Sequence, residues 1–498
     1  DQEVFSNPKW ALEGAKPNLM VSLDSRRIVQ RHVNAQLLSA FFATIDEKDG
    51  DKLTREKWCD QTGLDYLRWL SSLCDDDVGA DLKRALERVT RFSVLAEESV
   101  ASMAADSHNE MMAHIKSWKD EMHRYNFLIA DVKDEIGKKA LTHQLKRFKD
   151  EKIYEALTEA LYLPSTVRII NVTPFNYRTL QQEANEKYEH GSRHELPSRP
   201  AHIGIHEYAP GVSVVIDGAV YESGGLTLNW KSPASVEGVS EIQQIEHVMS
   251  CDCCGQQFLA SQASKGAACP NCGTWIMAAS SRYAIKPSGF CVPGNYVPNN
   301  DYTLLKHYPR KEATVFIEGE SRSFGNGDML RIKSSSMARV LSMNEGNGIG
   351  FAVCLNCGWA KPEVSADECE LDETYYQHSP LRISQHGVNE TGKCLGGLSG
   401  HDFQMKHNLV LAAEITTDAL EVVFNGACGL FGGDKERIES AGLGIGIALR
   451  RGVAERLGIE EDEIGIAVAL KRSLKTGDLI VNLYDHNMGG YSSRLEPM

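Results

Sequence analysis

Eight of the 13 cysteines in this chain fall into two groups whose spacing suits a tetrahedral zinc ion. The first group consists of two C-x-x-C-G motifs with the cysteines Cys251, Cys254, Cys269 and Cys272. The glycine after each pair lets the backbone turn so that its amide groups face the thiolate sulfurs. Four cysteine ligands leave no open coordination position, so this pattern predicts a structural zinc site. In this register Cys253 is a spare cysteine that points away from the metal.

The second group is one C-x-x-C-G motif followed by two single, widely spaced cysteines, and comprises Cys354, Cys357, Cys369 and Cys394. This pattern predicts a second zinc site, and the alternative is a set of buried thiols without a metal. One of four neighbouring histidines can replace a cysteine as ligand, although exposed loop histidines are commoner: His378, His386, His401 and His407. The isolated remaining cysteines are expected to be packing thiols: Cys59, Cys74, Cys291 and Cys428.

The sequence contains no convincing catalytic centre. No G-x-x-x-x-G-K-[ST] motif is present to bind phosphates, and Thr391–Cys394 is only a fragment of that pattern. The sequence also lacks a D-E-A-[DH] acid pair, a G-x-S-x-G nucleophile motif and an H-E-x-x-H zinc motif. Cys428 has no neighbouring base, which argues against a nucleophile. Whether the chain is an enzyme is therefore left open by its own residues.

Length and composition indicate an intracellular protein of several domains. A chain of 498 residues is too long for one hydrophobic core, and two to four domains are expected. Cysteines in C-x-x-C pairs favour metal-bound thiols in the cytoplasm over a secreted disulfide framework. The sequence shows no signal peptide and no apolar run long enough for a membrane span. The first residue is Asp1 and not Met, which favours a piece of a longer protein.

Hydrophobic periodicity predicts an N-terminal helical block and a C-terminal part rich in strands. Helical spacing from Asp24 to about Leu163 predicts helices nearly throughout, and Leu82–Ala160 contains no proline. The first helix has an apolar face formed by Val29, Val33, Leu37, Leu38 and Phe41. From Val167 to Trp230 the period changes to two, and Asp217-Gly218 predicts a two-residue hairpin turn. Further strands are expected at Ala313–Ile317, Met329–Lys333, Gly350–Cys354, Leu409–Phe424, Ile464–Leu470 and Leu479–Tyr484, with a helix at Ile438–Leu457.

The predicted fold class is a multidomain α+β protein. The domains expected are a linker segment with a helix (1–46), a helical domain or insertion (47–163), a small antiparallel β module (164–249), a four-cysteine zinc ribbon (250–290) and an α/β zinc-binding domain (291–498).

Several segments resemble bacterial superfamily 2 DEAD/DEAH-box helicases. The region just after the helicase motor is similar to Phe5–Pro8, Val21–Asp24 and Arg31–Leu38, and the β module that follows it is similar to Tyr208–Tyr221. The MrfA-type zinc-binding domain that closes such helicases resembles Phe351–Gly358, Thr417–Glu421 and Leu483–Tyr491. With its extended helical block, the chain looks most like an anti-phage defence helicase of the Druantia DruE kind.

This resemblance implies the C-terminal region of an ATP-dependent DNA helicase, a hydrolase whose ATP and magnesium bind to a motor outside this chain. The implied partners are single-stranded or forked DNA, motor domains in the same polypeptide and another defence-system subunit, with no membrane. The alternative is a non-catalytic zinc scaffold that binds a separate helicase or nuclease.

The net charge of −15 excludes a uniformly basic nucleic-acid surface, so DNA contact requires local basic clusters. Three clusters are candidates for nucleic-acid binding: Arg26, Arg27 and Arg31 on the first helix, Arg331, Lys333 and Arg339 on the central strands, and Arg450, Arg451, Lys471 and Arg472 near the end. Each cluster is also typical of a solvated helix or strand face.

Overall fold

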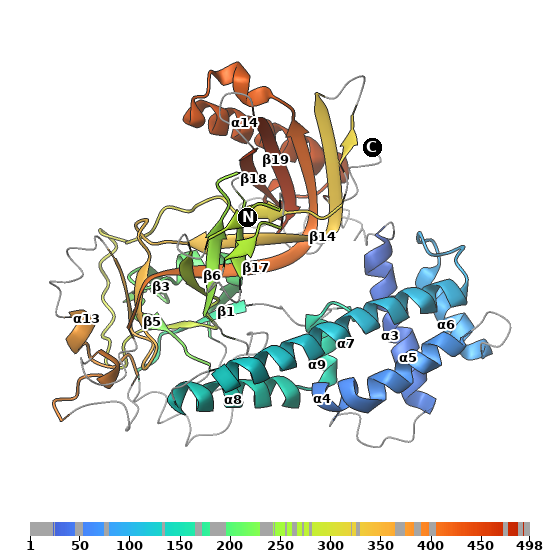
Figure 1. Ribbon diagram of the computed structural model, residues 1–498, viewed down its shortest axis with the longest axis horizontal. Helices are drawn as coiled ribbons and strands as arrows, with labels where there is room; N and C mark the ends of the chain where they lie inside the picture. Colours follow the sequence, from blue (N-terminus) through green and yellow to red (C-terminus); the bar gives the residue numbers. More distant parts are fainter. Residues whose placement is uncertain are drawn as a thin grey trace, which may run out of the picture.

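The computed structural model describes residues 23, 25–44, 53–73, 79–131, 135–164, 172–179, 196–229, 243, 245–253, 256–260, 266–270, 273–277, 281–319, 321–324, 329–363, 374–382, 390–397, 405–471, 477–486 and 492. Within these ranges it combines a helical block, a β-rich body and a smaller lobe that carries the last long helix (Figure 1). The α+β class expected from the sequence is therefore correct at the level of mixed helices and sheets.

The helical block contains α3 (Arg26–Thr44), α4 (Arg55–Lys57), the π-helical turn η2 (Trp58–Thr62), α5 (Gly63–Ser72), α6 (Ala80–Thr90), α7 (Val100–Asp131), α8 (Glu135–Asp150) and α9 (Ile153–Glu159). One apolar core joins these helices, and the predicted apolar face of α3 is buried in it. Aromatic rings fill much of this core, where Tyr66 is in ring contact with both Phe41 and Trp58. The helical prediction is wrong between α6 and α7, where residues 91–99 form turns and Phe92 takes a positive φ of 66° and is 77% exposed. It holds again from α7 to α9.

The first part of the β-rich body is a four-stranded sheet of order β2-β1-β11-β5. Its strands are β1 (Val172–Asn176), β2 (Ser198–Pro200), β5 (Gly225–Leu226) and β11 (Phe290–Cys291). Within the predicted β module, β1 pairs with β2 in antiparallel fashion, and so do the two strands around the predicted Asp217-Gly218 turn. Strand β1 also pairs in parallel with β11, which lies outside the predicted module and more than 100 residues away in sequence. The sequence failed to predict helix α11 (Ala201–Glu207), which packs between this sheet and the larger one.

The predicted hairpin is confirmed. Strands β3 (Ser213–Ile216) and β4 (Ala219–Glu222) pair with Ile216 opposite Ala219, so that Asp217 and Gly218 form the turn. Both turn residues have positive φ, 49° and 77°, which is the conformation that a type I′ turn requires.

An 11-stranded sheet forms the centre of the molecule along the path β12-β14-β17-β10-β6-β7. Its strands are β6 (Ile245–Ser250), β7 (Gln257–Ala260), β10 (Arg282–Ile285), β12 (Thr314–Phe316), β13 (Arg322–Ser323), β14 (Leu330–Asn344), β15 (Phe351–Cys354), β16 (Ala360–Pro362), β17 (Met405–Phe424), β18 (Ile464–Lys471) and β19 (Asp478–Asp485). Strand β14 extends far beyond the predicted Met329–Lys333 because it pairs with β17 along most of its length, interrupted by a bulge between Ser335 and Ala338.

The terminal lobe is formed by the far half of β17, β19 and β18, with α14 (Lys435–Leu457) packed on one face (Figure 1). Short 3-10 turns flank this helix, η5 (Ala427–Phe431) before it and η6 (Glu461–Glu463) after it. Asp434 caps the helix by accepting a hydrogen bond from the Arg437 amide, and Gly458 ends it with a φ of 67°. Gly442 and Gly446 let the helix approach the sheet closely, against Val468 and Ile466.

Candidate metal centre

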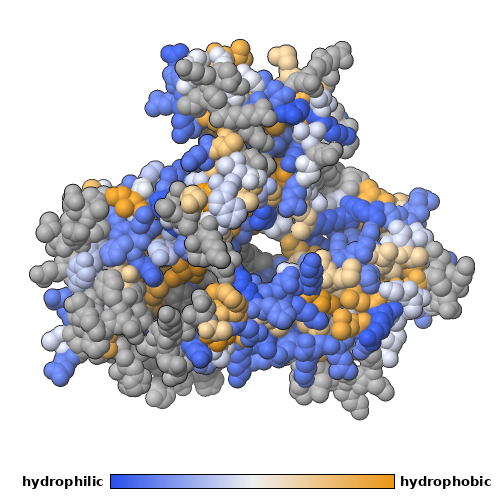
Figure 2. Space-filling model, viewed as in Figure 1, coloured by the Kyte–Doolittle hydropathy of each residue, from blue (hydrophilic) through white to orange (hydrophobic). Residues whose placement is uncertain are grey.

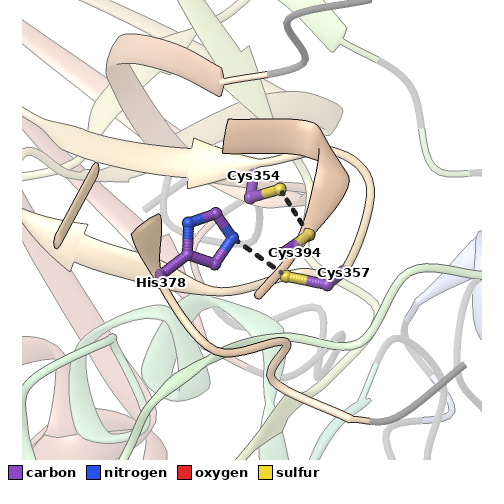
Figure 3. A group of neighbouring side chains, drawn as sticks. All are labelled: Cys354, Cys357, His378 and Cys394. Atoms are coloured by element: carbon purple, nitrogen blue, oxygen red, sulfur yellow. Dashed lines mark hydrogen bonds between the residues drawn. The ribbon is translucent and has the colours of Figure 1, made fainter. Parts of the chain in front are cut away.

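The four side chains of the candidate metal centre come from one strand, one turn and two loops. Cys354 is the last residue of β15, and Cys357 lies in the turn that leads to β16. His378 directly follows the short helix α13 (Thr374–Gln377), and Cys394 precedes the 3-10 turn η4 (Leu395–Gly397). Figure 3 shows the three sulfurs and the imidazole ring directed toward one another.

The turn between Cys354 and Cys357 folds as a C-x-x-C-G motif should. The Gly358 amide donates to the Cys354 carbonyl at 2.8 Å, and the Trp359 amide donates to the Cys357 sulfur at 3.4 Å. Gly358 has a φ of 83°, in the left-handed region that favours glycine. A Cβ at this position would lie 2.1 Å from the Leu226 carbonyl oxygen, so the glycine also permits close contact with β5.

The distances in the centre match a tetrahedral site. The ligand atoms of Cys354, Cys357, His378 and Cys394 all lie within 4.8 Å of one another. Two sulfurs bound at about 2.3 Å to a tetrahedral zinc ion lie about 3.8 Å apart, and a sulfur and an imidazole nitrogen lie about 3.6 Å apart. The structure has 3.8 Å between the sulfurs of Cys354 and Cys394, and 3.4 Å between the Cys357 sulfur and His378 Nε2.

Burial and electrostatics favour a cation among these groups. Cys354 and Cys394 are fully buried, and His378 is 4% exposed. Hydrogen bonds to Cys354 and Cys394 raise the pKa of the Cys357 thiol, and burial and the charges of the same two neighbours raise it further. Burial alone would lower the pKa of His378, but hydrogen bonds and charges from Cys354 and Cys394 outweigh it and raise this pKa to about 9. The sulfurs therefore stabilise positive charge at this point.

Neighbouring groups orient the ligands. The His378 ring stacks on Trp359 with centroids 4.7 Å apart and an angle of 18° between the planes. The Asn356 side chain donates to the Cys394 sulfur at 3.3 Å, and the Cys394 amide donates to the His378 carbonyl at 3.0 Å. Such outer contacts fix ligand geometry and are typical of metal sites. Three sulfurs and one imidazole with no open position are the donor set of a structural zinc site.

The structure brings together three of the four cysteines of the second predicted group, with His378 at the fourth position. Cys369, the fourth predicted cysteine, lies outside the described residues, as do His386 and His401. His407 is directed elsewhere, with its Nδ1 atom 2.6 Å from the buried Glu363 carboxylate. The sequence offered four histidines as possible replacements. Their spacing from the cysteines did not distinguish His378 from the others, because His378 reaches the site through the position of α13 in the fold.

Part of the first predicted group is described. Cys251 follows β6 and Cys269 follows β8 (Ala267–Ala268), and both are 2% exposed within one small apolar cluster. Their amides donate to the carbonyls of Gln256 and Thr274, which closes a tight turn after each cysteine. Strand β9 (Trp275–Ile276) pairs with β8, so each cysteine belongs to a hairpin. Cys254 and Cys272 lie outside the described residues, and the spare Cys253 is exposed.

The remaining described cysteines are buried, as expected of packing thiols. Cys59 lies in the core of the helical block, Cys428 lies under α14, and Cys291 lies in β11. Burial raises the pKa of Cys59 to about 11, which argues against a reactive thiolate. Cys74 lies outside the described residues. Among the cysteines that the structure describes, none forms a disulfide.

The three basic clusters proposed for nucleic-acid binding have different surroundings. On α3, Arg26 pairs with Glu98 and Asp106. Arg31 is buried, and the half-buried Arg27 donates a hydrogen bond to the Ser336 carbonyl of β14. On β14, Arg331 and Lys333 are two residues apart and share one face of the strand, and Arg339 follows the bulge with its side chain 45% exposed.

The third cluster lies at the edge of the terminal lobe. Arg450 and Arg451 on α14 form ion pairs with Glu461 and Glu455. Lys471 ends β18, but its side chain and the whole of Arg472 lie outside the described residues. Among the helices that the structure describes, none is both long and apolar enough to cross a membrane.

The chain is distantly similar to the Druantia protein DruE of Escherichia coli (strain UMEA 4076-1). The two sequences are 22% identical over 444 residues, which cover 81% of this chain and 23% of DruE. The chain therefore spans about a quarter of the length of the curated relative it matches. No family model matches the chain, and no solved structure matches it.

Proposed function

We propose that this chain is the zinc-binding C-terminal region of a larger anti-phage defence protein of the DruE kind, and that it holds nucleic acid beside an ATP-dependent helicase motor. The similarity to DruE extends along 81% of the chain, so it is not confined to one motif. The cluster of three cysteines and His378 supports the zinc-binding part of the proposal, because it has the donor set and the spacing of a structural zinc site.

In this proposal zinc has a structural role. Cys354 lies on β15, while His378 follows the short helix α13 and Cys394 precedes the short turn η4. One ion bound by all four residues would tie these loops to the large sheet, because metal ligation replaces the apolar burial that short loops lack. The hairpins that carry Cys251 and Cys269 would be stabilised in the same way by a second zinc ion, with Cys254 and Cys272 as the other ligands.

Metal analysis of the purified full chain tests the zinc sites. We expect two zinc equivalents per chain, one of which is lost in His378→Ala and in Cys394→Ser. Cys369→Ser is the matched control, because it removes a cysteine of the same predicted group while leaving all four residues of the cluster intact. Zinc content that falls in Cys369→Ser and not in His378→Ala would reject the arrangement of ligands proposed here.

Local cations would provide the contact with nucleic acid. Arg331 and Lys333 lie on the same side of β14 and suit two adjacent phosphates, although Arg331 also donates to the Asn425 side chain and Lys333 is opposite Glu421 of β17. Most other arginines of the candidate clusters are buried or paired with carboxylates. We propose single-stranded or forked DNA as the ligand. Each cation that contacts a phosphate adds to the salt dependence of binding.

A double charge reversal, Arg331→Glu with Lys333→Glu, tests this contact. We expect weaker binding to single-stranded and forked DNA of any sequence, and a smaller slope of affinity against salt. The matched control is Lys83→Glu with Arg84→Glu on α6, which changes the charge equally on an exposed helix of the helical block. If the native chain binds neither DNA at low salt, the scaffold alternative replaces the nucleic-acid proposal.

A further inference from the structure

The three sulfurs of the candidate metal centre differ in their access to solvent. Cys354 and Cys394 are fully buried, and the histidine of the centre, His378, is 4% exposed. Cys357 is only partly buried, and it lies in the turn between β15 and β16. A small reagent in solution therefore meets the centre first at the Cys357 residue. Figure 2 shows that much of the visible surface of the molecule is hydrophilic, which suits a polar reagent of this kind.

The two buried sulfurs are covered by their neighbours. A Cβ on Gly396 would lie 2.8 Å from the Cys354 sulfur, so the 3-10 turn η4 passes directly beside this sulfur. The Cys394 sulfur accepts a hydrogen bond from the Asn356 side chain at 3.3 Å and lies 3.8 Å from the Cys354 sulfur. Reagents reach Cys354 and Cys394 only after these contacts separate.

The Cys357 sulfur has the position of an oxidation-sensitive thiolate. A thiol that coordinates zinc is deprotonated, and the thiolate is the form of cysteine that attacks oxidants. Cysteines that respond to oxidants are accessible to solvent and have a second cysteine close enough to form a disulfide. Cys357 is partly exposed, and the sulfurs of Cys354 and Cys394 both lie within 4.8 Å of its own.

We propose that Cys357 is a site of oxidative modification, at which a peroxide oxidises the metal centre and releases its zinc ion. The proposal rests on the zinc binding proposed above and adds the residue at which the centre is opened. A reduced centre holds the segment that carries His378 against β15, and an oxidised centre frees this segment.

The reaction has two steps and consumes one molecule of hydrogen peroxide. In the first step the Cys357 thiolate attacks one peroxide oxygen, an S–O bond forms, the O–O bond breaks and hydroxide leaves. In the second step the thiolate of Cys354 or Cys394 attacks the oxidised sulfur, an S–S bond forms, the S–O bond breaks and a second hydroxide leaves. The two sulfurs together lose two electrons, which the peroxide takes up.

Disulfide formation removes two of the four ligands. His378 and the one remaining cysteine are too few to complete the tetrahedral geometry that structural zinc requires, so the ion leaves. The His378 side chain then has no ligand bond that ties it to β15. The oxidised chain should therefore resemble the zinc-free chain in the hydrogen exchange of β15 and β16.

Zinc release from the purified full chain tests the proposal. The reduced, zinc-loaded chain is treated with a small excess of hydrogen peroxide, and the released zinc is measured with a colorimetric chelator. We expect loss of the zinc equivalent that depends on His378, and its recovery when dithiothreitol and zinc are added back. Peptide mapping after alkylation should show Cys357 in a disulfide with Cys354 or Cys394.

The variant Cys357→His separates oxidation from zinc binding. An imidazole can replace a thiolate as a zinc ligand but forms no disulfide, so this variant should bind zinc and release it much more slowly in peroxide. The matched control is Cys253→Ser, which removes an exposed cysteine outside the cluster and should release zinc like the native chain. If Cys357→His binds no zinc, the disulfide mapped in the native chain decides between the outcomes.

The outcomes distinguish oxidation from zinc binding. Zinc content that does not fall in His378→Ala would reject the zinc site itself. A zinc-loaded centre that keeps its ion in peroxide, or that loses it equally fast in Cys357→His, would overturn the oxidation proposal and leave zinc binding intact. A disulfide between Cys354 and Cys394 with Cys357 still reduced would also overturn it, because a buried sulfur would then have reacted first.

Discussion

Substitution of Gly358 by alanine should loosen the candidate metal centre more than the same substitution of Gly392 does. Gly358 has a φ of 83°, and a Cβ would lie 2.1 Å from the Leu226 carbonyl oxygen. In the native chain the Leu226 amide donates to the Gly358 carbonyl at 2.8 Å, so β5 and the C-x-x-C-G turn are in direct contact. Relief of the clash requires this contact to separate.

The loss of stability in Gly358→Ala has three contributions. The left-handed conformation costs a residue with a Cβ about 1–2 kcal/mol. Loss of the hydrogen bond to Leu226 costs about 0.5–1.5 kcal/mol. Displacement of β5 by the added methyl group costs about 1–3 kcal/mol. Gly392 is the matched control, because it has a φ of 76° with no atom within 4 Å of its added Cβ. Gly392→Ala should therefore carry only the first of these costs.

Hydrogen exchange of peptides from β5 and β15 measures the difference locally, which suits a chain of several domains. We expect Gly358→Ala to lower the free energy of opening by about 2–4 kcal/mol more than Gly392→Ala. Zinc should also be lost to a chelator faster in Gly358→Ala. Equal exchange in the two variants would show that the contact with Leu226 does not hold the turn, and the argument from the close approach would be wrong.

Three further predictions concern the rest of the molecule. Gly446→Ala should destabilise the terminal lobe because its Cβ would lie 2.5 Å from Ile466. Gly444→Ala, with no atom within 4 Å of its added Cβ, should instead stabilise α14 by up to about 1 kcal/mol. Hydrogen exchange of the β18 amides measures both effects. Burial, with smaller contributions from nearby charges, lowers the pKa of His202 and of His206 to about 4. As the pH falls below 6.5, these two histidines therefore bind protons in the unfolded chain but not in the folded chain. Stability measured by thermal unfolding should therefore fall between pH 6.5 and about 4 and change little from these groups above pH 6.5. Removal of zinc by a chelator should increase exchange in β15, β16 and the start of β17, and leave α7 protected.

Local patterns allowed much of the fold to be predicted from the sequence. The alternation around Asp217-Gly218 gave the hairpin with its turn, and long apolar runs gave β17 and β19, because these elements are determined by nearby residues. Helix α11 was missed because its seven residues are too few to show a period. The parallel pairings of β1 with β11 and of β10 with β17 join segments distant in sequence, and periodicity carries no information on such partners.

The candidate site was likewise predictable only where its residues lie close together in sequence. The spacing of Cys354 and Cys357 predicted one half of the metal centre, because both ligands lie in one turn. The other half depends on loops, where the structure places His378 beside Cys394 through a backbone hydrogen bond between them. The interpretation of Arg27 and Arg31 as a solvated or DNA-binding face was limited for a different reason. A helical period separates polar from apolar faces, but it does not show that a polar face packs on another domain.

Strand β17 links the candidate metal centre to the terminal lobe, and its strand pairing explains why the two can be stabilised independently. Near its start it pairs with β15, opposite Cys354 of the candidate metal centre. Further along it carries the buried Asp418, and its last residues pair with β19 of the terminal lobe. From Leu411 to Phe424 it is also held by β14, which does not touch the metal ligands through any described pairing. This part of β17 is therefore supported without the metal, so loss of the ion should loosen the start of β17 and leave its pairing with β14 and β19 in place.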